Sequence, residues 1–199
     1  MNDDDDVDHQ KRRVLTAAAT VVGGIGVAYV ATPFILSMDP SAKAQAAGAP
    51  IDVDISKLQY GQLMTVEWRG KPIWILRRNE EMLNRIEDVS DQVRDPESEE
   101  LSQQPHYAKN KFRAVNPEFM IMIGLCTHLG CAPTFRPELA PDDLGAQWQG
   151  GFFCPCHGST YDLAGRVYLG KPAPSNLVVP PYRYVTNTRI LIGVDPERA

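Results

Sequence analysis

Cysteine, aromatic side chains and positive charge are all scarce in this 199-residue chain. It has only four cysteines and 8% aromatic residues, and its 20 Lys and Arg are outnumbered by 25 Asp and Glu, for a net charge of −5. Four cysteines are too few for a small domain held together by disulfides, and the acidic balance argues against a nucleic-acid-binding protein, which needs a basic face. A hydrophobic content of 43% excludes a disordered chain. The length allows one ordinary domain plus a small additional element.

Charged residues are absent from residues 14–38, which follow a polar segment, residues 1–13. As an α-helix, this run would be about 37 Å long at roughly 1.5 Å per residue, enough to cross a hydrocarbon core of about 30 Å. Basic residues lie mainly before it, so the positive-inside tendency places residues 1–13 in the cytoplasm and the rest of the chain outside. The sequence therefore predicts one transmembrane anchor over 14–38.

A cleaved export signal is the alternative to a retained anchor. The pair Arg12-Arg13 is similar to the start of a twin-arginine signal, and small residues between 44 and 49 offer a cleavage site. The apolar run is longer than the roughly 7–15 residues of a cleaved signal core. This length favours an uncleaved twin-arginine signal that serves as the anchor.

The pattern changes after a weakly polar segment, residues 39–50, which we expect to be a flexible hinge linker, either helical or extended. From residue 51 onward, apolar and polar residues alternate in short runs, and glycine and proline mark turns. The expected elements are strands at 51–55, 63–68, 71–76, 118–125 and 151–154, one helix at 79–88, a polar surface excursion at 88–117 and a closing hairpin within 176–194. The sequence thus predicts an all-β, mostly antiparallel domain over residues 51–199.

Two short segments carry all four cysteines and two of the four histidines. The first is C-T-H-L-G-C, residues 126–131, and the second lies at residues 154–161 and begins C-P-C-H-G-S. Each is expected on a loop next to a strand and offers a Cys and a His at short spacing. If the two loops face each other, six soft or borderline ligand atoms converge.

Two kinds of metal centre suit these ligands. A zinc ion would take two Cys and two His, or four Cys, in a tetrahedron. A two-iron cluster with Cys on one iron and His on the other needs one Cys-x-His and one Cys-x-x-His pair. Here those pairs are Cys126 with His128, and Cys154 with His157.

The two-iron interpretation leaves Cys131 and Cys156 unused. Outside the cytoplasm, such a pair can form a disulfide that ties the two loops together. A bridge between segments about 25 residues apart contributes roughly 3 kcal/mol in a chain-entropy estimate.

The two loops resemble those of the Rieske iron–sulfur protein of cytochrome bc complexes. The resemblance covers the whole chain, including the twin-arginine anchor, the alanine-rich linker and the stretch G-K-P-A-P at 170–174, which is similar to the family's proline loop. The family usually has Gly-Pro-Ala-Pro there, so the additional Lys171 is a departure that affects the local turn. The resemblance implies an antiparallel Rieske-type β head with an inserted cluster-binding subdomain and one [2Fe–2S] cluster.

The resemblance also implies roles for individual residues of the two loops. The ligands would be Cys126 and Cys154 on the inner iron and His128 and His157 on the outer, solvent-facing iron, and the disulfide would join Cys131 and Cys156.

Four further residues of these loops have implied roles. Ser159 would donate a hydrogen bond to a bridging sulfide, and Tyr161 would donate one to the sulfur of Cys126. Leu129 and Gly130 would cover the cluster and meet the partner.

The function implied by the resemblance is that of the iron–sulfur subunit of a quinol–cytochrome c oxidoreductase. It would take an electron from ubiquinol, and a proton through His157, and pass the electron to a c-type cytochrome, which contributes to a proton gradient. The implied partners are cytochrome b and c-type cytochrome subunits in a dimeric complex of the cell inner membrane, with the C-terminal head in the periplasm. The alternatives are the Rieske subunit of another exported oxidoreductase such as arsenite oxidase, a plastoquinol-oxidising complex, and a binding module with structural zinc.

Overall fold

The computed structural model describes residues 8–196, and the chain divides into two units between Ala46 and Ala47. The N-terminal unit holds the helix α1 (His9–Leu36) and most of α2 (Ala42–Gly48). α1 begins at His9 because the side chain of Asp8 accepts hydrogen bonds from the first backbone N–H groups of the helix. It therefore starts five residues before the expected anchor and ends two residues before the anchor's expected end.

The helix α1 has the properties of a membrane span. Its most apolar 18-residue window has a mean hydropathy of 1.9, and none of its described side chains is buried. A helix that is apolar on all sides and buries nothing within its own chain is suited to a lipid environment. In the linker at 39–50, α2 adopts the helical form that the alanine-rich composition allows.

The second unit is built from nine described strands in three antiparallel sheets, ordered β1-β9-β8, β2-β3-β4 and β5-β6-β7. The bounds are β1 (Ile51–Asp54), β2 (Leu63–Trp68), β3 (Lys71–Arg77), β4 (Phe119–Ile123), β5 (Thr134–Arg136), β6 (Gly151–Cys154), β7 (Ser159–Tyr161), β8 (Tyr182–Thr186) and β9 (Arg189–Ile192). Two short helices, α3 (Glu80–Asp88) and the 3₁₀ turn η2 (His106–Ala108), lie between β3 and β4 in the chain. The predicted all-β class is confirmed, and the three-residue strands β5 and β7 were not predicted.

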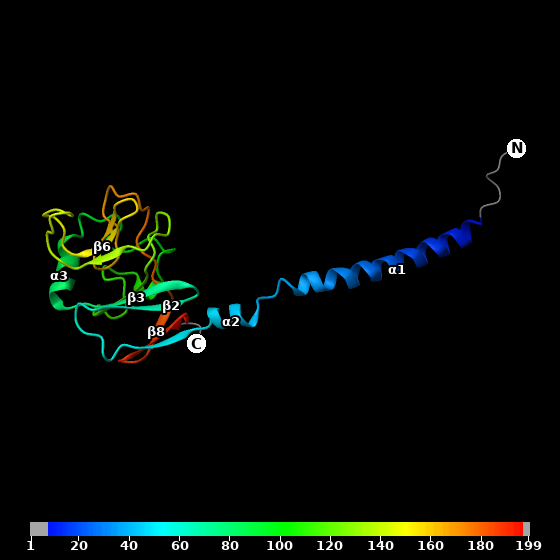
Figure 1. Ribbon diagram of the computed structural model, residues 1–199, viewed down its shortest axis with the longest axis horizontal. Coiled ribbons are helices and arrows are strands. Elements are labelled where there is room, and N and C mark those ends of the chain that lie inside the picture. Colours follow the sequence, from blue (N-terminus) through cyan, green and yellow to red (C-terminus); the bar gives the residue numbers. More distant parts are fainter. Residues whose placement is uncertain (1–7, 197–199) are drawn as a thin grey trace. The chain divides into compact units, whose positions relative to one another are not determined.

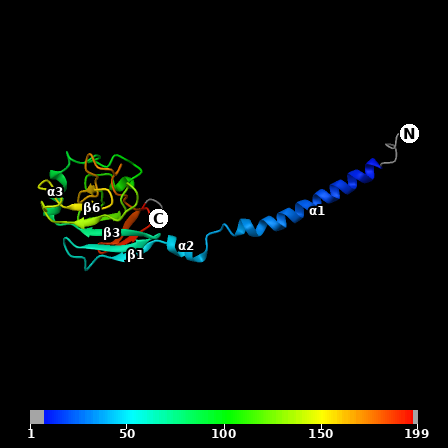
Figure 2. The same cartoon turned by 45° about the horizontal axis from the view of Figure 1, so that its top comes forward.

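The sheet β2-β3-β4 lies between the other two sheets, as both views show (Figures 1 and 2). Alternate residues of β3 enter different cores: Ile73 and Ile75 pack in the core shared with β1, β8 and β9, whereas Trp74 and Leu76 pack in the core shared with α3, β6 and β7. A strand that is buried on both faces needs a continuous apolar run instead of an alternating one. This explains the run F-M-I-M-I of β4, which leads directly into the first cysteine-containing loop.

The segment at 88–117 differs from the sequence expectation of a polar surface excursion. It buries several side chains, among them Val93, Gln104, Ala108 and Arg113. Polar residues are tolerated there because their hydrogen bonds are satisfied inside the domain; the guanidinium of Arg113, for example, donates to the carbonyl of Leu177 at 2.6 Å. The segment is therefore part of the folded core.

Candidate metal centre

The two cysteine-containing loops have the same backbone construction. In the first, the N–H of Gly130 donates to the carbonyl of Cys126 at 2.9 Å; in the second, the N–H of Gly158 donates to the carbonyl of Cys154 at 2.9 Å. Both glycines have positive φ, 81° and 73°, a conformation that costs glycine little. Each loop thus folds back on its first cysteine, so that the following Cys and His side chains project from a tight turn.

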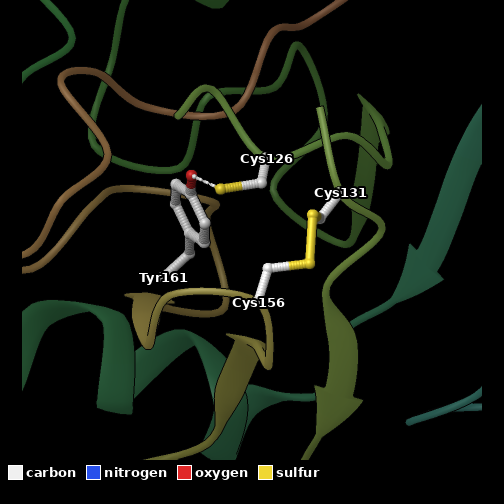
Figure 3. Close-up of a disulfide and its surroundings, with 4 residues drawn as sticks. All are labelled: Cys126, Cys131, Cys156 and Tyr161. Carbon is white, nitrogen blue, oxygen red and sulfur yellow. Dashed lines mark hydrogen bonds between the residues drawn. A yellow bond between two sulfur atoms is a disulfide. The ribbon is translucent and has the colours of Figure 1, made fainter. Parts of the chain in front are cut away.

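A disulfide between Cys131 and Cys156 holds the two loops together (Figure 3). Their Cα atoms are 6.7 Å apart, and 25 positions separate them in the chain. The loops come from different places in the fold: the first follows β4, and the second connects β6 to β7. The cross-link makes a single site of the two loops.

The four expected ligands lie on the two loops that this disulfide joins. Cys126 and Cys154 are free thiols that are 3% and 1% exposed, and the ring centroids of His128 and His157 are 4.7 Å apart. His157 is exposed and His128 is half-buried. The arrangement therefore has sulfur in the interior and imidazole toward the surface.

One buried nitrogen atom of the two histidine rings lacks a hydrogen-bond partner within residues 8–196. The Nδ1 atom of His128 is buried and has no hydrogen-bond partner among the described residues. A buried polar atom without a partner is costly, and an imidazole nitrogen beside buried thiols is a typical metal ligand. The residues present therefore fit a metal centre bound by Cys and His. A four-cysteine zinc site is excluded because two of the cysteines form the disulfide.

The hydroxyl of Tyr161 lies 3.1 Å from the sulfur of Cys126, and Figure 3 shows the two groups facing each other. Burial disfavours the thiolate of Cys126, but hydrogen bonds from Tyr161 and the backbone of His128 outweigh this effect, so the pKa of Cys126 lies below its ordinary value. Burial raises the pKa of Cys154 and of Tyr161. Tyr161 is therefore a proton donor, and Cys126 is the sulfur prepared to accept that hydrogen bond.

The proline loop at 170–174 and the residue after it are attached to both cysteine-containing loops. The hydroxyl of Ser159 accepts a hydrogen bond from the N–H of Ala173 at 3.1 Å, and the hydroxyl of Thr127 donates to the carbonyl of Ser175 at 2.6 Å. The role of Thr127 was missed in the sequence, where nothing indicates its distant backbone partner. The expected role of Ser159 toward a sulfide stays a prediction.

The tip of the first loop is open to solvent. Leu129 is 71% exposed, and Gly130 is also exposed. An apolar side chain that projects into water beside a buried site is a candidate for contact with a partner. Leu129 is therefore well placed for docking.

Comparisons of the sequence with known proteins identify a family. The family described as "Rieske [2Fe-2S] domain" matches residues 51–183, and the one described as "Ubiquitinol-cytochrome C reductase Fe-S subunit TAT signal" matches residues 1–41. The "Ubiquinol-cytochrome c reductase iron-sulfur subunit" of Allochromatium vinosum is 54% identical over 95% of this chain and 91% of its own length. The protein of the same name from Blastochloris viridis is 45% identical over 97% of this chain and 98% of its own. A solved structure titled "Hyperthermophilic respiratory Complex III" covers 89% of this chain and 98% of its own, with 26% identity and a TM-score of 0.48.

The β head, its paired loops and the matching family model together define a Rieske-type protein with one [2Fe–2S] cluster. Three further features separate this chain from other Rieske-type proteins: the apolar N-terminal helix, the match to the twin-arginine signal model, and relatives at 45% and 54% identity. The chain belongs to the family of ubiquinol–cytochrome c reductase iron–sulfur subunits.

Proposed function

We propose that this chain is the membrane-anchored iron–sulfur subunit of a quinol–cytochrome c oxidoreductase, which takes electrons from ubiquinol and passes them to a c-type cytochrome. The observation that carries the proposal is the pair of imidazole rings, 4.7 Å apart, on the same two loops as two buried free thiols. This arrangement suits a centre that exchanges electrons with partners at the protein surface. The names of the relatives point to the same activity.

The ligands of the cluster would be Cys126 and Cys154 on the inner iron and His128 and His157 on the outer iron. When bound, such a cluster accepts and releases one electron at a time, at a potential raised by its neutral imidazole ligands. The hydroxyl of Tyr161 withdraws charge from the Cys126 sulfur by hydrogen bonding, which raises the potential further. The disulfide keeps the two loops from separating and admitting water.

The proton of the quinol would pass to His157. Its ring is exposed, so a quinol hydroxyl can reach it. With one ring nitrogen holding the iron, the other nitrogen would accept the quinol's hydrogen bond, and then its proton, in the deprotonated form of the ring that an oxidised iron favours. Leu129 and Gly130, next to the histidine pair, would pack against the apolar rim of the quinol site on cytochrome b. His157 then orients the substrate and takes its proton as the electron leaves.

The N-terminal unit would hold the protein at the membrane. Arg12 and Arg13 lie within the first turns of α1, just before its uncharged run, and the positive-inside tendency would favour an N-terminus in the cytoplasm and a head in the periplasm. The linker at 39–50 would let the head swing between the quinol site on cytochrome b and the c-type cytochrome of a dimeric complex.

A purification and a kinetic assay together test the proposal. The full chain, extracted from membranes, is expected to co-purify with b-type and c-type haem, to give a Rieske EPR signal on reduction and to support quinol-dependent cytochrome c reduction. Replacement His157→Ala should abolish the signal and the turnover, whereas His106→Gln, in the 3₁₀ turn η2, should retain both. A colourless, iron-free chain that still supports turnover would contradict the proposal.

A further inference from the structure

The interior of the head holds more positive than negative charge. Among the described residues, the buried charged side chains are Arg78, Arg113, Arg166 and Asp162, which are at most 1% exposed. Arg166 is paired with Asp162, with 2.7 Å between Nε and Oδ2. Arg78 and Arg113 form no ion pair among the described residues. The carboxylate of Asp162 attracts both of them, and that of Asp95 attracts Arg113. The buried side chains therefore carry a net positive charge.

Backbone carbonyl groups hold these two guanidinium groups in place. Arg78 donates to the carbonyl of Leu163 at 3.2 Å, and Arg113 donates to those of Leu177 at 2.6 Å and Gly165 at 3.4 Å. Neutral carbonyls satisfy the hydrogen bonds but do not cancel the charge. Burial lowers the pKa of both arginines to about 10, so both stay protonated near neutral pH.

Two of the carbonyls that bind the arginines lie just after the second cysteine-containing loop. Leu163 and Gly165 follow Tyr161 by two and four residues, and the hydroxyl of Tyr161 contacts the sulfur of Cys126 at 3.1 Å. Consecutive Cα atoms are about 3.8 Å apart, so Leu163 and Gly165 lie within about 8 Å and about 15 Å of the Tyr161 Cα atom. Both buried arginines are therefore bound to the segment that directly follows the second cysteine-containing loop.

We propose that Arg78 and Arg113 raise the reduction potential of the centre and thereby determine which quinols can reduce it; this inference rests on the proposed function. Two ferric ions, two sulfides, two thiolates and two neutral imidazoles sum to zero charge, and one added electron makes the sum negative. A buried cation favours the anionic form, because the protein interior screens the attraction poorly. The two arginines thus raise the reduction potential through their charge, without contact with the cluster ligands.

The expected size of the effect follows from Coulomb's law at a separation on the order of 20 Å. A unit charge removed at roughly 20 Å, with an effective dielectric constant of about 20, changes the equilibrium constant for reduction about fourfold. For one electron, this corresponds to about 35 mV, at about 59 mV for each tenfold change.

Potentials of charge variants of the full chain, purified from membranes, test the inference. Arg78→Gln and Arg113→Gln should each lower the midpoint potential by about that amount in an EPR-monitored redox titration. Lys111→Gln is the matched control: it removes the same charge two residues from Arg113, but Lys111 is exposed and paired with Glu87 at 2.5 Å. Its potential should equal that of the wild type.

A second variant leaves both arginines in place. The side-chain oxygen of Gln104 accepts a hydrogen bond from Arg113 at 3.0 Å, so Gln104→Glu adds a negative charge there with almost no change in volume, and the potential should again fall. An unchanged potential in these variants would overturn the inference. A raised potential would also overturn it, because water that enters a loosened loop stabilises the anionic form. If the wild-type chain shows no reversible one-electron signal, the proposed function itself fails.

Discussion

The hydroxyl oxygen of Tyr161 lies 3.1 Å from the sulfur of Cys126 and also 3.1 Å from the backbone nitrogen of Thr127. The N–H of Thr127 donates to this oxygen. The phenol proton then has two acceptors, the sulfur of Cys126 and the Thr127 hydroxyl oxygen at 3.2 Å, whose own proton is donated to the carbonyl of Ser175. Both side chains of the pair are buried, so water does not compete for the bond. The contact joins the first loop to the strand that follows the second loop.

We expect Tyr161→Phe to lower the midpoint potential while the cluster is retained. The lost hydrogen bond has a net value of about 1 kcal/mol, which corresponds to roughly 40 mV for one electron. Ser159→Ala should act in the same direction. Tyr168→Phe is the control, because the Tyr168 hydroxyl is buried without a hydrogen-bond partner among the described residues. Equal potentials in Tyr161→Phe and the wild type would contradict the assignment.

Removal of the disulfide by the double substitution Cys131→Ala and Cys156→Ala should lower the free energy of unfolding by about 3 kcal/mol. The 25-position separation of the two cysteines sets this value through the entropy of the unfolded chain. Urea unfolding of the detergent-solubilised chain, followed by circular dichroism, measures it. If the double variant and the wild type unfold at the same urea concentration, the expectation is contradicted.

The stability of the head should fall as the pH rises above about 10. Burial raises the pKa of Tyr107 from its ordinary 10.0 to about 12, and the pKa values of four other tyrosines are raised mainly by burial, namely Tyr161, Tyr168, Tyr182 and Tyr184. Unfolded tyrosines lose their protons first, so the contribution is complete below pH 10 and is lost as the pH rises through the folded pKa.

Each fully buried tyrosine would lower the free energy of unfolding by at most about 1.4 kcal/mol per pH unit. The partly solvated Tyr107 would contribute less than this. Urea unfolding between pH 8 and 11 should show this loss, and Tyr107→Phe should make the slope shallower. A flat profile across this range would rule out the explanation.

The mature protein is expected to keep its N-terminal helix. The 28 residues of α1 exceed the usual core of a cleaved signal, so intact-mass analysis of the membrane-extracted protein should find residues 8–46 attached to the head. An N-terminus between residues 47 and 51 would show that the helix is removed after export.

Stiffening of the linker should slow turnover without altering the centre. The substitutions Ala44→Pro and Ala46→Pro would break α2 and restrict the linker to extended forms. Cytochrome c reduction should fall severalfold, while the EPR signal and the midpoint potential stay the same. The pair Ala44→Ser and Ala46→Ser serves as the control, and undiminished turnover in the proline variant would refute the swing of the head.

The sequence predicted those parts of the fold in which local pattern and burial agree. The hairpin of β2 and β3 is an example: its strands have a strong apolar pattern, and Arg69 and Gly70 form a two-residue turn with φ of 53° and 69°. The spacing of the two cysteine-containing loops likewise identified the site, because few other sites need these residue types so close together.

Long-range hydrogen bonding could not be predicted. Arginine is a residue type that usually lies on the surface. Arg113 can be buried because the carbonyls of Leu177 and Gly165, more than 50 positions away in the chain, accept its hydrogen bonds. The bond from Thr127 to Ser175 is hidden for the same reason. The strands β5 and β7 are too short, at three residues each, to show a period.

The hairpin strand β3 and the start of the first loop meet at Gly124. A Cβ atom on Gly124 would lie 2.2 Å from the ring of Trp74, which in turn stacks on Phe152 with 4.9 Å between ring centroids. A side chain at position 124 therefore requires a smaller residue at position 74. Among homologous sequences, positions 74 and 124 should therefore covary, with a larger residue in place of the glycine accompanied by a smaller one in place of the tryptophan.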